Sequence, residues 1–120
     1  MRLKNFLLVV EDIDRSIQFY TELFGLYVVS RFEGNVILTE GLVLQERKNW
    51  EALTGKNVEY HSFAFELFFT EKDMNGFLDK LETSSFEIQY INPVAENSWG
   101  RRVVRFYDPD HHVIEVGEEE

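Results

Sequence analysis

Apolar residues recur along this chain in two spacings, and the change from one spacing to the other predicts its secondary structure. A largely apolar run from Leu3 to Val10 predicts a buried strand. The next apolar stripe has helical spacing and consists of Ile13, Ile17, Tyr20 and Phe24. Asp12 is placed to cap the start of this helix, and Gly25 stands where a left-handed residue ends one.

Three short strands are expected after this helix. They cover Leu26 to Arg31, Asn35 to Thr39, and Leu42 to Glu46. The pairs Glu33-Gly34 and Glu40-Gly41 are turn formers that separate them. The region from Arg47 to Val58 lacks such patterning and is expected to be a loop. The first half of the chain therefore has the order βαβββ.

The second half repeats this order. Aromatic and small residues alternate from Glu59 to Phe68, which predicts a strand. Thr70, with Asp73 three residues later, is the expected cap of a helix. The apolar stripe of that helix is Met74, Phe77, Leu78 and Leu81. Three further strands are predicted over Phe86 to Ile91, Arg102 to Tyr107, and His112 to Val116.

This repetition predicts an α+β fold built from two tandem βαβββ modules. A ferredoxin-like βαββαβ chain has two strands between its helices, whereas the interval from Leu26 to Phe69 has room for four. We expect module 1 to cover about residues 1–57 and module 2 about residues 58–120, together forming a single domain. A length of 120 residues is typical of one domain.

Composition narrows the classes of partner. The formal net charge of −10 disfavours nucleic acid and anionic membranes and suits a cationic ligand. The chain has no cysteine, which excludes disulfides, thiolate metal sites and thiol nucleophiles. No apolar run is long enough to cross a bilayer, and the N-terminal residues lack the apolar stretch of a signal peptide. We expect a soluble protein of the cytoplasm.

Three histidines and one glutamate are the first candidates for chemistry. His61 shares a predicted strand face with Phe63 and Phe65, a setting in which a histidine is more often structural than a ligand. The adjacent His111 and His112 would face opposite ways and are interpreted as structural. Glu115 stands between two apolar residues of the last strand. It either protects a sheet edge from aggregation or belongs to a site.

Longer motifs resemble a known family. The segment "FYDPDHHVIEV" over residues 106–116 resembles the closing motif of the vicinal oxygen chelate superfamily, also called the glyoxalase/bleomycin resistance/dioxygenase family. The segment "LVVEDIDRSIQFYTELFGL" over residues 8–26 is similar to the first helix of that family, and "NSWGRRVVRFYDPD" adds its Trp-Gly-x-Arg approach. Essentially the whole chain is covered by this resemblance.

The resemblance implies that each module contributes to a concave, mostly antiparallel sheet that forms a cup. In metal-using members, ligands point inward from the first strand of each module and from the final strand, and a divalent metal then binds two neighbouring oxygens of a substrate. His61 and Glu115 fall at two of these positions, and Glu115 is also the implied catalytic residue. The first-module position holds Asn5, and Gln45, preferred over Glu46 by register, is the fourth candidate.

A set of Asn5, Gln45, His61 and Glu115 would hold a divalent metal weakly, because amide oxygens are poor donors for Zn, Ni or Fe(II). The two-histidine, one-carboxylate iron site of ring-cleaving dioxygenases is not available. His111 also replaces the glycine that the family has in its closing motif. Two interpretations stay open.

The first interpretation is a divalent-metal-dependent lyase, isomerase, epimerase or thiol transferase. The second, slightly favoured because Asn5 replaces a histidine, is a metal-free binding or resistance-type protein. Resemblance to bleomycin resistance proteins implies a homodimer that holds a cationic or aromatic compound, with Asn5 of one chain facing His61 and Glu115 of the other. The expected ligand-binding residues are Trp50, Phe63, Phe65, Trp99 and Arg102.

Overall fold

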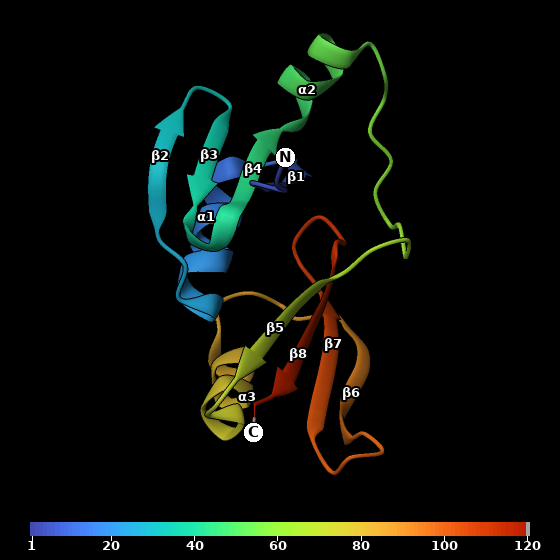
Figure 1. The fold of residues 1–120 in the computed structure, drawn as a ribbon. Helices are drawn as coiled ribbons and strands as arrows, with labels where there is room; N and C mark the ends of the chain where they lie inside the picture. The colour runs from blue at the N-terminus through green and yellow to red at the C-terminus, as the bar shows by residue number, and fades with distance from the viewer. Residues whose placement is uncertain (120) are drawn as a thin grey trace. The chain divides into compact units, whose positions relative to one another are not determined.

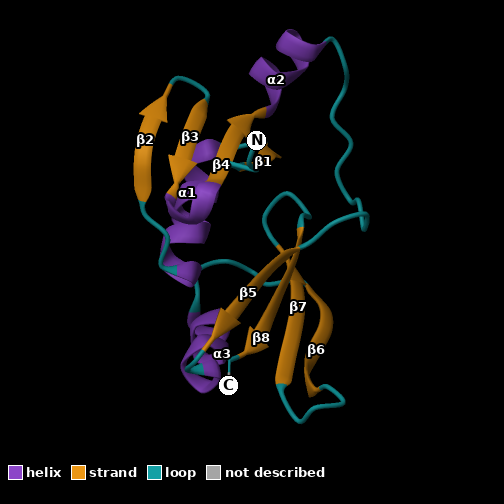
Figure 2. Ribbon diagram, viewed as in Figure 1, coloured by secondary structure: helices purple, strands orange, loops and turns teal. Residues whose placement is uncertain are grey.

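The computed structural model describes residues 1–119 (Figure 1). The chain divides into two compact units, one over Met1–Glu59 and a second that starts at Tyr60. Each unit contains one four-stranded sheet (Figure 2). Within residues 1–119, every helix is too short or too polar to cross a membrane.

The first unit contains one mixed sheet. Its elements are β1 (Phe6–Val10), α1 (Ile13–Phe24), β2 (Val28–Phe32), β3 (Asn35–Leu38), the 3-10 turn η1 (Thr39–Gly41), β4 (Leu42–Glu46) and α2 (Arg47–Thr54). The strand order is β1-β4-β3-β2. β1 runs parallel to β4, and the other neighbours are antiparallel.

Both predicted ends of α1 are confirmed. The Asp12 side chain accepts a hydrogen bond from the Arg15 backbone N–H at 3.1 Å, and Gly25 ends the helix with φ of 67°. The predicted stripe is displaced, because among its members only Tyr20 is fully buried. The residues that α1 buries are Ser16, Phe19, Tyr20 and Leu23. The buried residues Ser16, Phe19 and Leu23 each precede a member of the predicted stripe by one position.

The second unit repeats the connectivity of the first. Its elements are β5 (Leu67–Glu71), α3 (Met74–Thr83), β6 (Tyr90–Glu96), β7 (Arg102–Tyr107) and β8 (Val113–Glu118). The strand order is β5-β8-β7-β6, and β5 runs parallel to β8 as β1 does to β4. The predicted α+β fold with two βαβββ modules is therefore confirmed.

Several predicted boundaries are wrong. The strand expected over Glu59 to Phe68 begins only at Leu67, because the first residue pair between β5 and β8 is Leu67 with Ile114. Thr70 lies in that strand and pairs with Gly117. The helix cap is Asp73, whose Oδ1 accepts from the Gly76 N–H at 3.0 Å.

A helix, α2, forms where a loop was expected. Arg47 and Glu51 lie one turn apart and form an ion pair of 2.7 Å, which supports a short helix. Gly55, with φ of 72°, ends α2 in the left-handed conformation. The predicted strand over Phe86 to Ile91 is also displaced, since β6 begins at Tyr90.

The core of the second unit lies between α3 and one face of its sheet. The buried residues of α3 are Met74, Phe77 and Leu81, and the buried residues of the sheet include Val104, Phe106, Ile114 and Val116. The rings of Phe77 and Phe106 lie 6.2 Å apart, which joins helix and sheet. Strand residues alternate between faces, so Arg105 and Glu115 must point away from α3.

Candidate functional site

Arg105 and Glu115 lie directly opposite each other on neighbouring strands β7 and β8. Arg105 Nε donates to Glu115 Oε1 at 2.6 Å, and Arg105 Nη1 donates to Asn92 Oδ1 at 3.2 Å. The Glu115 side chain is 14% exposed and that of Arg105 is 41% exposed. The pair is therefore half-buried, and the guanidinium is held in place by two strands.

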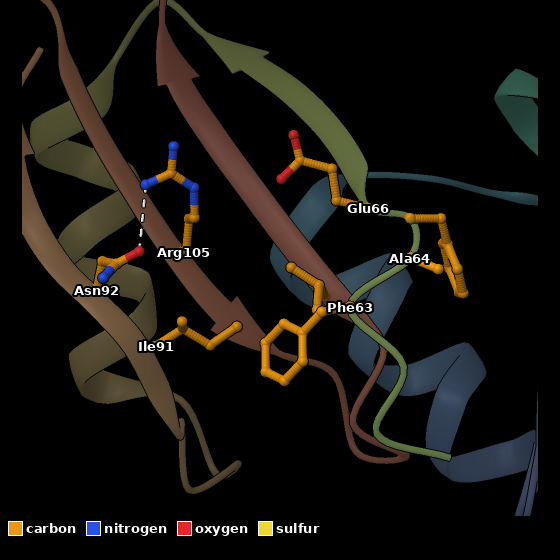
Figure 3. Close-up of a pocket in the computed structure, with 8 residues that line it drawn as sticks. Phe63, Ala64, Glu66, Ile91, Asn92 and Arg105 are labelled. Carbon is orange, nitrogen blue, oxygen red and sulfur yellow. Dashed lines mark hydrogen bonds between the residues drawn. The ribbon is translucent and has the colours of Figure 1, made fainter. Parts of the chain in front are cut away.

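Glu66 brings a second carboxyl group to this pair. It lies just before β5, and its carboxyl group is close enough to that of Glu115 for the two charges to interact. Burial, followed by the negative charge of Glu115, raises the pKa of Glu66 above its ordinary 4.5, while Arg105 partly opposes this shift. Figure 3 shows the Glu66 carboxyl directed across β8 towards Arg105.

These groups border a cavity of about 360 Å³. Its lining residues are Phe63, Ala64, Phe65, Glu66, Ile91, Asn92, Arg105 and Val113 (Figure 3). We call the face of this sheet that carries Arg105, Val113 and Glu115 the cavity face. Apolar walls with a few polar groups are typical of small-molecule sites, and this volume lies in the range of such sites.

His61 does not share a ligand set with Glu115 inside this unit. It lies outside any strand, with φ of 68°, and its ring contacts that of His111 in a tilted arrangement with centroids 4.1 Å apart. His111 also contacts Gln89 through Nε2 at 2.9 Å. The prediction that His61 projects from a strand is wrong, because β5 begins six residues later.

His112 has the structural role that was expected. Its Nδ1 lies 2.7 Å from Asp108 Oδ2, and its backbone N–H donates to Asp108 Oδ1 at 2.9 Å. Both side chains are buried, and the rings of Tyr60 and Phe65 lie near the imidazole. These contacts close the turn between β7 and β8, and that turn sets the register of Arg105 against Glu115.

Asn5 and Gln45 belong to the first unit. Gln45 Oε1 accepts from Asn35 Nδ2 at 2.8 Å, and this pair has the same place in the first sheet that Glu115 and Arg105 have in the second. Asn5 precedes β1, with its side chain near Gly41.

The donors that the structure offers do not fit a transition-metal site. Among residues 1–119, no group of three or more His, Cys, Asp or Glu side chains is arranged to hold a metal ion. Glu115 already neutralises a cation, and His61 lies outside the strands that carry Glu115 and Arg105. Asn5 and Gln45 would add only neutral amide oxygens, which bind such metals poorly.

Only some of the predicted ligand-binding residues line the cavity. Phe63 and Phe65 line the cavity. Arg102 points to the helix-covered side of the sheet, where it pairs with Glu118 and Asn75, so it is not part of this cavity. Trp99 lies in the exposed turn between β6 and β7, and Trp50 lies in α2 of the first unit.

Sequence reasoning missed Glu66, Asn92 and Arg105. Two of these residues could have been placed next to Glu115 from the sequence. A tight turn centred on Asp110 places Arg105 opposite Glu115 by counting equal steps along both strands. Glu66 lies two residues before Phe68, the cross-strand partner of Glu115, so alternation puts both on one face. Asn92 had no such signal, because β6 contains register shifts on both sides of it.

Replacing Glu66 with glutamine is expected to change how stability depends on pH. A folded-state pKa above 4.5 means that the folded protein binds this proton more tightly than the unfolded chain. The contribution of Glu66 to stability is therefore complete below pH 4.5 and is lost as pH rises through the raised pKa. Urea unfolding between pH 4 and 7 should show Glu66→Gln gaining stability relative to wild type with rising pH. A difference that is constant across this range would contradict the assignment.

The chain resembles known proteins in both sequence and fold. A family model described as a glyoxalase-like domain matches residues 3–119. No curated protein matches the chain. Among solved structures, a protein of unknown function from Agrobacterium tumefaciens str. C58 is 32% identical with a TM-score of 0.84, over 100% of this chain and 95% of that one.

Two further structures share the fold at lower identity. A glyoxalase-related enzyme from Fulvimarina pelagi is 20% identical with a TM-score of 0.82, over 98% of this chain and 88% of that one. A lactoylglutathione lyase from Agrobacterium tumefaciens is 21% identical with a TM-score of 0.70, over 98% of this chain and 92% of that one.

Proposed function

This chain belongs to the family of glyoxalase-like domains, and from that premise we propose that it binds a small organic molecule on its cavity face without a resident metal ion. The observation that carries the proposal is the cavity of about 360 Å³ beside Arg105 and Glu66. A cavity of this size admits a ligand with one ring or a short chain, but not a macromolecule.

The lining determines what such a ligand must contain. Phe63, Ile91 and Val113 provide apolar surface for a hydrocarbon or aromatic part. Glu66, Asn92 and Arg105 provide hydrogen-bonding groups along the other side of the cavity. The ligand is therefore amphipathic, with one apolar end and one polar end. The aromatic ligand expected from the sequence fits this description.

The metal-dependent lyase, isomerase or thiol transferase is the second candidate function. Two findings support this candidate: the chain belongs to the glyoxalase-like family, and a lactoylglutathione lyase is among the structures of similar fold. The donor chemistry described above argues against it, because the final-strand carboxylate is engaged by Arg105. The metal-free interpretation is therefore the stronger proposal.

The proposal is tested with three probes that share a phenyl ring and differ in charge: benzamide, benzoate and benzamidine. Each is titrated into ¹⁵N-labelled protein that has been dialysed against EDTA. We expect at least one probe to shift the backbone amide signals of Glu66, Ile91, Asn92 and Arg105 in a saturable way. We expect millimolar dissociation constants, which correspond to a binding free energy of about −4 kcal/mol.

Phe63 and Phe32 provide a matched pair of variants. Both rings are well exposed, at 67% and 62%, but only Phe63 lines the cavity. Phe63→Ala should weaken the affinity for the probe about fivefold, equivalent to about 1 kcal/mol, whereas Phe32→Ala should leave this affinity unchanged. If no probe shifts the cavity signals, or if shifts require added divalent metal, the proposed function is wrong.

A further inference from the structure

We propose that the guanidinium group of Arg105 has the place of a metal ion on the cavity face and holds an uncharged carboxamide group of the ligand. This inference rests on the proposed function and adds to it the residue that anchors the ligand and the chemical class of the anchored group. Neither the family resemblance nor the sequence pattern singled out Arg105.

The first step concerns Glu115. The resemblance implies that this carboxylate is a metal ligand, yet its Oε1 accepts a charge-assisted hydrogen bond of 2.6 Å from Arg105 Nε. The side chain is largely buried, so this pair is screened less by solvent than a surface pair. A divalent cation bound at Glu115 would have to displace the guanidinium or lie beside its positive charge. An internal organic cation thus occupies the position that the fold family gives to a metal.

The second step concerns the donors that Arg105 still has. A guanidinium carries five N–H groups, and the contacts with Glu115 and Asn92 use two of them. Among the described residues, the other three have no acceptor, and the side chain is partly exposed on the cavity wall. Because β8 and β6 hold the group from two sides, its remaining donors are oriented before a ligand arrives.

The third step concerns the charge of the ligand. Arg105 and Glu115 neutralise each other, and Glu66 adds a second carboxyl group beside them. A carboxylate ligand would therefore meet two acidic groups, and a cationic ligand would meet the guanidinium. A carboxamide avoids both conflicts, because its oxygen accepts from Arg105 and its N–H donates to Glu66. The apolar remainder of the ligand would lie against Phe63 and Ile91.

The first unit supplies an internal comparison. At the same register positions of its sheet, it carries Asn35 and Gln45, joined by a neutral hydrogen bond of 2.8 Å. The two modules share their strand pairing, but only the second places a cation at this point. A charged pair is therefore not a requirement of the fold, and its presence in the second unit calls for a functional explanation.

The test measures benzamide binding by the same amide-shift titration in EDTA-dialysed protein. Arg105→Gln removes the cation, and we expect it to weaken benzamide binding at least tenfold. Arg102→Gln is the matched control, since Arg102 lies on the same strand and pairs with Glu118 of β8, but on the helix-covered side. We expect the control to bind benzamide as wild type does.

A second variant separates binding from folding. Arg105→Asn combined with Glu115→Gln reproduces the amide pair of the first unit, so it retains a cross-strand hydrogen bond without burying an unpaired carboxylate. We expect it to give a dispersed spectrum like that of wild type and still to lose benzamide binding at least tenfold. Full binding by this folded variant would overturn the inference.

Two more outcomes bear on the inference. Benzamidine binding more tightly than benzamide would overturn the assignment of an uncharged group. Titration with Ni²⁺ is expected to leave the signals near Glu115 unbroadened, and stoichiometric broadening that is lost in Glu115→Gln would overturn the replacement of metal by Arg105. Failure of the proposed function looks different, because then none of the three probes shifts the cavity signals of wild type, and this inference falls with it.

Discussion

Replacing Asp108 with alanine is expected to destabilise the protein by about 3–5 kcal/mol. The Asp108 side chain is fully buried and accepts hydrogen bonds from the backbone N–H groups of Asp110 and His112, both at 2.9 Å. It also contacts the His112 ring at 2.7 Å. Alanine would leave all these groups buried without their acceptor, and each such group costs about 1–3 kcal/mol. Urea unfolding followed by circular dichroism measures the effect.

Two variants serve as controls for Asp108. Asp108→Asn keeps the shape and one carbonyl acceptor, so its loss should be clearly smaller than that of alanine. Asp14→Ala removes a carboxylate of a surface ion pair with Arg31 and should cost less than about 1 kcal/mol. A loss below 1 kcal/mol for Asp108→Ala itself would show that the turn is not held by this side chain.

Replacing Phe106 with alanine is expected to cost about 3–5 kcal/mol. The Phe106 side chain is completely buried and lies 6.2 Å from the ring of Phe77 in α3 and 6.4 Å from that of Tyr90 in β6. Its loss leaves a cavity between helix and sheet that neighbouring side chains fill only partly. Since Arg105 directly precedes Phe106 in β7, the same packing also positions the strand that carries Arg105.

Phe68 gives the contrast on the same sheet. Its side chain is 56% exposed, whereas that of Phe106 is 0% exposed, and it lies on the cavity face. Phe68→Ala should therefore change the free energy of unfolding by less than about 1 kcal/mol. Equal losses for the two variants in urea unfolding would contradict the division of this sheet into a packed face and a cavity face.

The repeated order of elements was predictable from the sequence because it depends on local signals. Apolar spacing, the Asp12 cap and the Gly25 terminator act within a few residues. The helix and both of its ends are confirmed, whereas its buried stripe is displaced from the predicted one. The beginning of β5 was not predictable in this way. A strand exists only where a neighbour pairs with it, and the pairing of β5 with β8 starts only at Leu67 and Ile114. The homodimer, the cationic ligand and the cytoplasmic location stay predictions.

The candidate site was predicted in part. Glu115 was expected on the inner face of a sheet, and it lies beside the cavity on the face away from α3. Its partner is Arg105 and not His61, because alternation along a strand cannot be extended to a residue that precedes the strand. Register shows the same limit, because β5 pairs with β8 only from Leu67 onward and His61 lies six residues before the first pair.

The most direct test of the account is a crystal structure of EDTA-treated protein soaked with 4-iodobenzamide. The anomalous signal of iodine locates the ring independently of the refined coordinates. We expect the iodine in the cavity near Phe63 and Ile91, with the amide oxygen within hydrogen-bonding distance of Arg105 and the Arg105–Glu115 pair intact. An empty cavity with the probe bound elsewhere, or a metal ion on Glu115 with Arg105 turned away, would contradict the account.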